Sequence, residues 1–369
     1  MTPKANVLLV GMGGIGTISA LNLETGGRAA VTGVLRSNYE VVAQKGFNIK
    51  SVDHGIVNGF KPSTVLKQIP NVAKDNIQPY KYVLCTTKNY ADIPPTVAEL
   101  IQPAITPGYT VIVLIQNGLN IDKPLLVAFP QNVILSGTSF CGSHQLSPAE
   151  ILHEDGDKLF VGAFRNPHLD PAVEDREARE FCDVYAAGGK CVCEHQPDVG
   201  FTRWRKLLYN ACLNSLCAIT DLDTGRMQIA DGAVENLVRP AMEEIRAAAK
   251  ACGHELPAEL VDVMIALDPV TMYNPPSMQV DIRNVSCPGD FVRSQVLRAC
   301  ANVVLVQRRF TEFENIVGEP LREGTARGVK MPVLTVVYHL LRSMQWKIKE
   351  ERGLVEIPAR VDHTNTSST

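Results

Sequence analysis

The chain has 369 residues, 45% of them hydrophobic and 20% charged, which is the composition of a globular protein of two or three domains. Its net charge of -3 indicates neither nucleic acid nor an anionic membrane as a partner, and no apolar run is long enough to span a bilayer. The first predicted strand starts near the N-terminus, so we expect no signal peptide. The 10 cysteines do not suggest a disulfide framework, so we expect a cytoplasmic protein with reduced thiols and no metal site.

A glycine-rich turn follows the first predicted strand. Residues 7–10 are a run of aliphatic residues typical of a buried parallel strand, and residues 17–23 continue as a helix. Glycines between them form G-x-G-x-x-G, the pattern that places a dinucleotide pyrophosphate at a helix N-terminus. The alternative is a glycine-rich turn without a ligand. The predicted cofactor-binding residues of this turn are Gly11, Met12, Gly13, Gly14, Ile15 and Gly16.

The end of the second strand, predicted over residues 29–35, distinguishes NADP from NAD. A carboxylate there would bind the ribose 2′-OH of NAD, whereas an arginine accommodates the 2′-phosphate of NADP. The sequence has Arg36 and Ser37 and no carboxylate before Glu40. We therefore favour NADP, with Arg36 as its phosphate ligand. The alternative is that Arg36 is an ordinary solvated charge.

Polar residues follow two further buried strands, predicted over residues 82–86 and 110–115. Lys88 comes just after the first, and Asn117 just after the second. Ligands bind at the carboxyl ends of the strands in sheets of this kind, so we expect both side chains at the cofactor edge.

The rest of the first half contains shorter elements. Residues 45–70 suggest small strands or a ribbon, and residues 133–135 suggest another strand. Residues 151–153 and 158–162 are interpreted as the two arms of a hairpin around Asp155-Gly156-Asp157. A polar helix over 171–187 and a strand over 191–194 complete this half.

The pattern changes after Asp198, where strand signals nearly disappear and helical periodicity begins. Pro240 falls inside one expected helix and should kink it. The predicted helices cover residues 204–218, 232–252, 257–267 and 331–349. We therefore divide the chain into an α/β Rossmann-type dinucleotide-binding domain (1–198), an all-α helical substrate domain (199–357) and a disordered polar tail (358–369), with the active site between the two domains.

One predicted helix carries a polar stripe. Lys206, Asn210 and Asn214 recur every four residues, so they share one face of an otherwise apolar helix. Such groups are costly to bury unless they are satisfied, and they could bind a polar substrate. A solvated face or an internal hydrogen-bond network remains the alternative on this spacing alone.

The chain resembles the ketopantoate reductase (2-dehydropantoate 2-reductase) family from Gly11 to about Ile348. The motifs that carry the resemblance are Gly11-x-Gly13-x-x-Gly16, Leu35-Arg36, Thr87-Lys88, Gln116-Asn117-Gly118, Trp204-Arg205-Lys206-Leu207, Asn210 with Asn214, Pro276-Ser277-Met278, Asp281-Ile282-Arg283, and Thr311-Glu312 with Gly318. The resemblance implies a helical domain like the C-terminal domain of 6-phosphogluconate dehydrogenase. It also implies NADPH-dependent reduction of ketopantoate to pantoate, a precursor of pantothenate and coenzyme A.

The resemblance also assigns roles to individual residues. Lys206 and Glu312 would be catalytic, with Lys206 as the proton donor to the ketone oxygen and Glu312 near both cofactor and substrate. The other implied contacts are Lys88 and Asn117 on the nicotinamide side, and Asn210, Asn214 and Ser277 on the hydroxyl and carboxylate of the small-molecule 2-keto acid. Hydride addition builds negative charge on oxygen, which a nearby ammonium stabilises before giving up a proton. The family allows a homodimer.

One position departs from the family and leaves the substrate open. Members often carry an asparagine just before the glycine matched by Gly225, whereas this chain has Thr224. The change removes a partner for the substrate hydroxyl. Three functions are therefore considered: a ketopantoate reductase, a reductase of another 2-keto acid, or an NADP-binding sensor without catalysis. A sensor needs only the first domain, so it is argued against by the retained Lys206, Asn210, Ser277 and Glu312.

The second departure is an interruption. Asp281-Ile282-Arg283 and Thr311-Glu312 are only a few residues apart in the family, but residues 284–310 separate them here. Removal of residues 285–307 restores the family spacing. Val285-Ser286 can be encoded by GTAAGT, a common intron start, and Gln307 by CAG, a common intron end. We expect residues 285–307 to be a translated intron, and the alternative is a genuine lineage-specific insertion.

Overall fold

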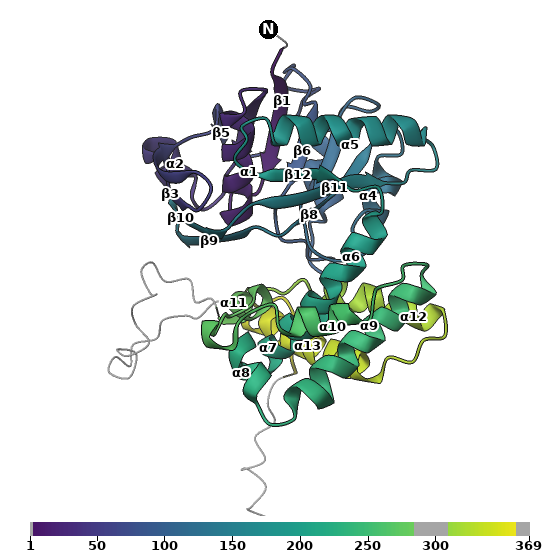
Figure 1. Cartoon of the computed structure of the whole chain (residues 1–369). Helices are drawn as coiled ribbons and strands as arrows, with labels where there is room; N and C mark the ends of the chain where they lie inside the picture. The colour runs from purple at the N-terminus through teal and green to yellow at the C-terminus, as the bar shows by residue number, and fades with distance from the viewer. Residues whose placement is uncertain (1–2, 284–308, 359–369) are drawn as a thin grey trace, which may run out of the picture.

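The computed structural model describes residues 3–283 and 309–358. Figure 1 shows two bodies, an α/β domain built by the first half of the chain and a helical domain built by the second, with helix α6 (Val199–Leu207) passing from one to the other. Helix α6 begins at the predicted domain boundary, where the Asp198 carboxylate caps it by accepting a hydrogen bond from the Phe201 N–H at 2.8 Å. The predicted fold class, a Rossmann-type domain followed by a helical domain, is confirmed.

The main sheet of the α/β domain is parallel except where β8 and β11 meet. Strand β1 lies between β2 and β6. The chain therefore builds β2 on one side of β1 and later returns to build β6 and its neighbours on the other side. This switch point is where doubly wound sheets bind their ligands. In order across the sheet, the strands are β12 (Val192–His195), β11 (Lys158–Phe164), β8 (Ile134–Ser139), β7 (Val111–Leu114), β6 (Tyr82–Cys85), β1 (Ala5–Val10), β2 (Ala29–Val34) and β5 (Thr64–Leu66).

Helices cover both faces of this sheet, and strand β1 shows why. Val7 and Leu9 point into one buried core, and Leu8 and Val10 point into the other, as the alternation of side chains along a strand requires. Helices α1 and α5 pack on the first core, and α3 and α4 on the second. The helices of this domain are α1 (Gly14–Thr25), α2 (Tyr39–Lys45), α3 (Val97–Ile101), the short 3₁₀ turn η1 (Gln102–Ala104), α4 (Lys123–Ala128) and α5 (Pro171–Tyr185).

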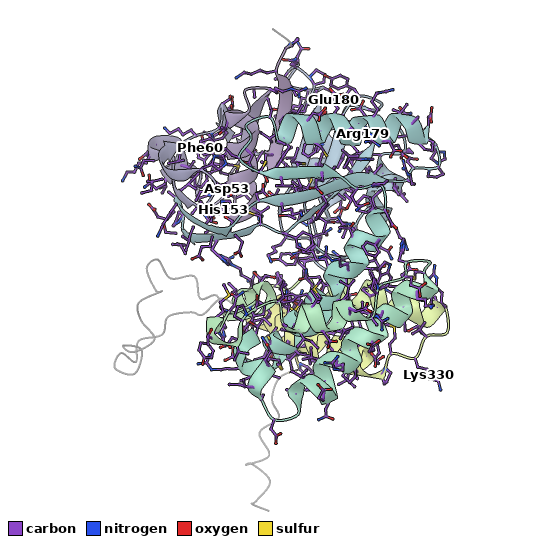
Figure 2. All side chains as sticks on the ribbon, viewed as in Figure 1. Asp53, Phe60, His153, Arg179, Glu180 and Lys330 are labelled. Atoms are coloured by element: carbon purple, nitrogen blue, oxygen red, sulfur yellow. The ribbon has the colours of Figure 1, made fainter. Side chains whose placement is uncertain are left out.

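A second sheet lies beside the first and overturns one prediction. Residues 151–153 and 158–162 do not form a hairpin, because β10 pairs with β3 and β9 while β11 pairs with β8 and β12. The apparent turn is a crossover between sheets: the Asp157 N–H donates to the Asp53 carboxylate at 2.8 Å. Figure 2 shows Asp53 beside His153 at this crossover. The strands are β4 (Gly55–Phe60), β3 (Phe47–Ser51), β10 (Glu150–Asp155) and β9 (Gly142–Ser147).

The helical domain contains α-helices, short π-helical segments that precede some of them, and the 3₁₀ turn η4. The helix predicted over 204–218 is present, but it starts earlier, at Val199, and its middle is the π-helical segment η2. Pro240 is the second residue of α9 and lies directly after a π-helical segment. The kink expected at Pro240 is therefore present as a π-helical interruption of the helix. The elements are η2 (Leu208–Asn214), α7 (Ser215–Thr220), α8 (Thr224–Ile229), η3 (Val234–Val238), α9 (Arg239–Ala251), α10 (Glu259–Ile265), η4 (Val270–Met272), α11 (Ser277–Arg283), η5 (Glu314–Gly318), α12 (Glu319–Ala326) and α13 (Pro332–Glu351).

Two predicted segments fall outside the described residues, namely the insertion at 285–307 and nearly all of the tail. Among the helices of residues 3–283 and 309–358, none is both long and apolar enough to cross a membrane.

Candidate active site

The glycine-rich turn closes the carboxyl end of β1 and opens α1. Gly11 has a φ of +104°, and a Cβ built on it would lie 2.7 Å from the backbone nitrogen of Thr87. A Cβ on Gly16 would collide with the Gly11 carbonyl oxygen, so the helix could not pack this closely with a larger residue. Gly13 is the N-cap of α1, and no side chain caps the helix. The first N–H groups of α1 therefore fit an anionic group such as a pyrophosphate.

Strand β9 runs beside this turn, which the sequence did not indicate. A Cβ on Gly14 would lie 2.7 Å from the Ser143 carbonyl carbon, so glycine is required there by the strand rather than by a ligand. The space in front of Gly13 is open, since the nearest atom to a Cβ built there is 4.0 Å away. The Met12 side chain is buried in the core of the domain and the Ile15 side chain is partly buried against it, so we expect mainly their backbone to contact a cofactor.

Arg36 lies just beyond the end of β2, exposed to solvent. Within the part of the chain that the structure describes, its guanidinium has no hydrogen bond or ion pair. The next turn is tied to the glycine-rich loop, because Asn38 Nδ2 donates to the Met12 carbonyl at 3.3 Å. Arg36 is therefore a free cation at the edge of the sheet where the predicted 2′-phosphate would lie. Asn38 carried no signal in the sequence.

Lys206 lies in the last turn of α6, between the two domains. Its ammonium donates to the Ser139 carbonyl at the end of β8 and lies 5.3 Å from the centre of the Phe140 ring. Burial, followed by the positive charge of Arg203, lowers the pKa of Lys206 to about 8. A lysine with such a pKa can hold a proton and release it near neutral pH.

The polar stripe continues through η2. Asn210 and Asn214 are both buried, and Asn214 Nδ2 donates to Asn210 Oδ1 at 3.1 Å. Asn214 Nδ2 also lies 3.5 Å from the hydroxyl of Ser277, the first residue of α11. Asn214 Oδ1 is buried without a hydrogen-bond partner. The three residues predicted to hold the substrate are therefore neighbours, and π-helical segments of this kind occur often at functional sites.

Lys88 joins the two domains through a pair of carboxylates. Its ammonium lies 2.7 Å from Asp281 Oδ2 and 3.3 Å from Glu312 Oε2, and Glu312 Oε1 accepts from the Asn89 N–H at 2.8 Å. Burial lowers the pKa of Lys88, but the Glu312 and Asp281 carboxylates outweigh it and raise the pKa. Burial raises the pKa of Glu312, and Lys88 partly offsets this. Lys88 is thus a fixed cation, unlike Lys206. The role of Asp281 was not predicted.

Asn117 reaches the same region from the carboxyl end of β7. With Lys206 and Asn210 it lines a cavity of about 10 Å³ between the domains. Arg203 also lines this cavity and was not predicted, although its place three residues before Lys206 puts it on the same side of the helix. The full lining is Gln116, Asn117, Gly118, Thr138, Arg203, Lys206, Leu207 and Asn210. Within the described residues, no cluster of His, Cys, Asp and Glu side chains could hold a metal ion.

A Rossmann-type sheet with a glycine-rich turn at its switch point, facing a helical domain with a lysine of lowered pKa, is the arrangement of a two-domain oxidoreductase. The family model described as ketopantoate reductase PanE/ApbA matches residues 7–166, and the model of its C-terminal domain matches residues 198–286 and 305–345. The chain belongs to the ketopantoate reductase family. The gap in the second match lies within the predicted insertion.

Individual relatives cover almost the whole chain. An uncharacterized protein of Saccharomyces cerevisiae is 31% identical over 95% of this chain and 97% of its own length. The 2-dehydropantoate 2-reductase of Nostoc sp. is 25% identical over 90% of this chain and 93% of its own. The crystal structure of 2-dehydropantoate 2-reductase from Methylococcus capsulatus is 28% identical, covers 93% of this chain and 97% of its own, and superposes with a TM-score of 0.70.

The two sides of the insertion meet in the structure. The Arg309 N–H donates to the Asp281 carbonyl at 3.1 Å. If residues 285–307 were removed, these two residues would stand five positions apart, the spacing of hydrogen bonds in π-helices and at helix C-termini. The described residues on either side are therefore arranged as though the chain between them were short.

Proposed function

We propose that this protein reduces 2-dehydropantoate to pantoate with NADPH. The observation that carries the proposal is Lys206, a lysine with a pKa of about 8 in one cavity with Asn117 and Asn210. The relatives named 2-dehydropantoate 2-reductase and the family models support the substrate. The test is to follow loss of NADPH absorbance by the purified full chain with 2-dehydropantoate and with a panel of other 2-keto acids.

The α/β domain would hold the cofactor. The N-terminus of α1 would bind the pyrophosphate through its backbone N–H groups, and Arg36 would bind the 2′-phosphate. Lys88 and Asn117, at the carboxyl ends of β6 and β7, would lie on the nicotinamide side. NADPH, when bound, supplies the hydride that adds to the keto carbon.

Lys206 would stabilise the oxygen of the keto group as negative charge develops there, and would then donate its proton to that oxygen. Asn210, Asn214 and Ser277 would hold the polar groups of the substrate, and the unpartnered Asn214 Oδ1 is a ready acceptor for a substrate hydroxyl. Glu312 would orient Lys88, to which it is paired. These steps need no metal ion.

The cofactor preference gives a direct prediction. The Arg36→Asp variant should weaken NADPH binding by roughly tenfold or more and NADH binding much less, because it removes a charge-assisted contact to phosphate and adds repulsion. Dissociation constants for both cofactors, measured by fluorescence titration, check this result.

The matched control for this prediction is Arg179→Asp, the same change of charge at an exposed position of α5, labelled in Figure 2. It should leave both affinities near those of the unaltered protein. Equal losses for NADPH and NADH in Arg36→Asp would show that Arg36 does not contact the 2′-phosphate.

A second candidate function, reduction of another 2-keto acid, is favoured by Thr224. Its side chain is fully buried at the start of α8, and its hydroxyl donates to the Asn274 carbonyl at 3.1 Å. Thr224 does not line the cavity that holds Lys206. The Thr224 hydroxyl proton is therefore already donated to a backbone carbonyl, and the hydroxyl is a poor partner for a substrate hydroxyl.

The Thr224→Asn variant should separate the two candidates. If the natural substrate lacks the hydroxyl of 2-dehydropantoate, the asparagine should lower the KM for 2-dehydropantoate by roughly threefold to tenfold, the effect of one hydrogen bond. The KM for a 2-keto acid without that hydroxyl should not fall. Thr224→Val is the control, since it removes the hydroxyl at constant size. A KM for 2-dehydropantoate that is already low and rises in Thr224→Asn would favour the first candidate.

A further inference from the structure

The buried side chain of Arg203 connects α6 to the α/β domain. Its Nε donates to the Ser136 hydroxyl at 2.8 Å, and its Nη1 donates to the carbonyls of Gly118 at 2.7 Å and Gln116 at 3.2 Å. The guanidinium also lies 4.9 Å from the centre of the Phe164 ring. These contacts hold the guanidinium in one orientation, although a buried charge is uncommon without a carboxylate partner.

One nitrogen of this guanidinium has no partner. Arg203 Nη2 is buried and makes no hydrogen bond, and Gln116 Oε1 is a buried acceptor that makes none either. Both residues line the cavity of about 10 Å³ that also contains Lys206 and Asn210. A cavity of roughly this volume holds one water, provided that polar groups surround it. The unsatisfied donor and acceptor are the partners that such a water needs.

The charged and titratable groups around Lys206 come from four elements of the fold. Arg203 lies one turn earlier on α6, Lys88 follows β6, Glu312 comes from the helical domain, and Cys141 follows β8. Arg203 and Lys88 repel the Lys206 ammonium, whereas Glu312 attracts it. Of the charged neighbours, Arg203 has the largest effect. The acid that faces Arg203 itself is Asp122, at the start of α4, and the two make no ion pair.

We propose that Arg203 and Gln116 hold one buried water in this cavity, and that the fixed guanidinium favours release of the Lys206 proton. Arg203 is thus a positioning residue that acts through Lys206, which rests on the proposed role of Lys206 as proton donor. A water bound to Nη2 completes the hydrogen bonds of the guanidinium and keeps its charge in place. The charge then repels the ammonium and makes it a stronger acid.

The first experiment measures the titration of Lys206 without turnover. Lysine side chains of the full chain are labelled with ¹³C, and the Lys206 signal is assigned by its loss in a Lys206→Met variant. We expect Arg203→Gln to raise the pKa of Lys206 by roughly one unit, as removal of a nearby like charge should. Arg203→Lys keeps the charge and should leave the pKa near its original value. The control Arg205→Gln removes an equal charge two residues away, from a side chain that does not line the cavity.

The titration decides between a charge effect and a purely structural role. If Arg203→Gln and Arg203→Lys shift the Lys206 titration equally, or if neither does, the proposal is wrong. The titration needs no substrate, so a chain that reduces no 2-keto acid could still support the inference about Arg203. Conversely, an active enzyme with an unshifted titration would contradict the inference and leave the proposed function intact.

The second experiment tests the water and needs no variant. A high-resolution crystal structure of the full chain should show one water within hydrogen-bond distance of both Arg203 Nη2 and Gln116 Oε1. A cavity without solvent density, or a side chain that fills it, would overturn the proposal even if the arginine variants fail to fold.

Discussion

Replacing Lys206 with alanine should lower kcat for the 2-keto acid by roughly 10²- to 10⁴-fold, the usual effect of removing a general acid. Lys206 lies between the two domains, close to Asn117 and Asn210, so its loss leaves the developing alkoxide without a proton donor. Affinity for NADPH should change little. Steady-state turnover and a separate measurement of NADPH binding check the two parts of this result.

The control for Lys206→Ala is Lys330→Ala, the same truncation at an exposed position far from the cavity, labelled in Figure 2. The unaltered protein should also lose activity as the pH rises through about 8, because the reaction needs the protonated amine and that form is lost above its pKa. Near-normal turnover in Lys206→Ala would remove this residue from the mechanism. No turnover by the unaltered protein with any 2-keto acid, together with tight NADPH binding, would support the sensor instead.

Deleting residues 285–307 should raise both the soluble yield and the activity of the protein several-fold. Modest stabilisation of a protein produces changes of this scale. The family model is interrupted here, and the Arg309 N–H already donates to the Asp281 carbonyl across the gap. The shortened chain could therefore keep this hydrogen bond and the contact of Asp281 with Lys88. Soluble yield and kcat/KM of the two chains, expressed in parallel, check the result.

A third chain separates the effect of length from that of composition. It replaces residues 285–307 with a glycine- and serine-rich segment of equal length, and it should resemble the full chain if the added length alone is harmful. Transcript reads across codons 284 and 308 test the intron directly. If every mature message retains these codons and the shortened protein is inactive, residues 285–307 are a genuine part of the protein.

Local patterns predicted the elements that depend on neighbouring residues. The turn from Gly11 to Gly16 could be identified because the strand, the glycines and the helix are adjacent in the chain. The stripe from Lys206 to Asn214 could be identified because helical spacing places its members on one face. The interdomain contact of Lys88 with Glu312 is different. It joins residues more than 200 positions apart, so only the family resemblance could indicate it.

Two features could not be predicted for physical reasons. Asp155-Gly156-Asp157 has the composition of a hairpin turn, but the Asp157 side chain is buried and accepts hydrogen bonds from Asn22 and Tyr185. That long-range pairing directs the chain to another sheet, and local turn chemistry does not contain it. Arg203 was overlooked because arginine in a sequence is normally a surface residue, and only the fold shows what surrounds it.

The connection from β8 to β9 contacts both ends of the candidate site. At Ser139 its carbonyl accepts from the Lys206 ammonium, and at Ser143 its backbone lies against the first residue of α1. A dinucleotide that displaced this short connection at Ser143 would also move the Ser139 carbonyl that accepts from Lys206. Cofactor affinity and proton affinity then belong to one thermodynamic cycle, in which each ligand changes the binding of the other by the same factor. If Lys206 is the proton donor, a bound dinucleotide would then help to set the protonation of its amine.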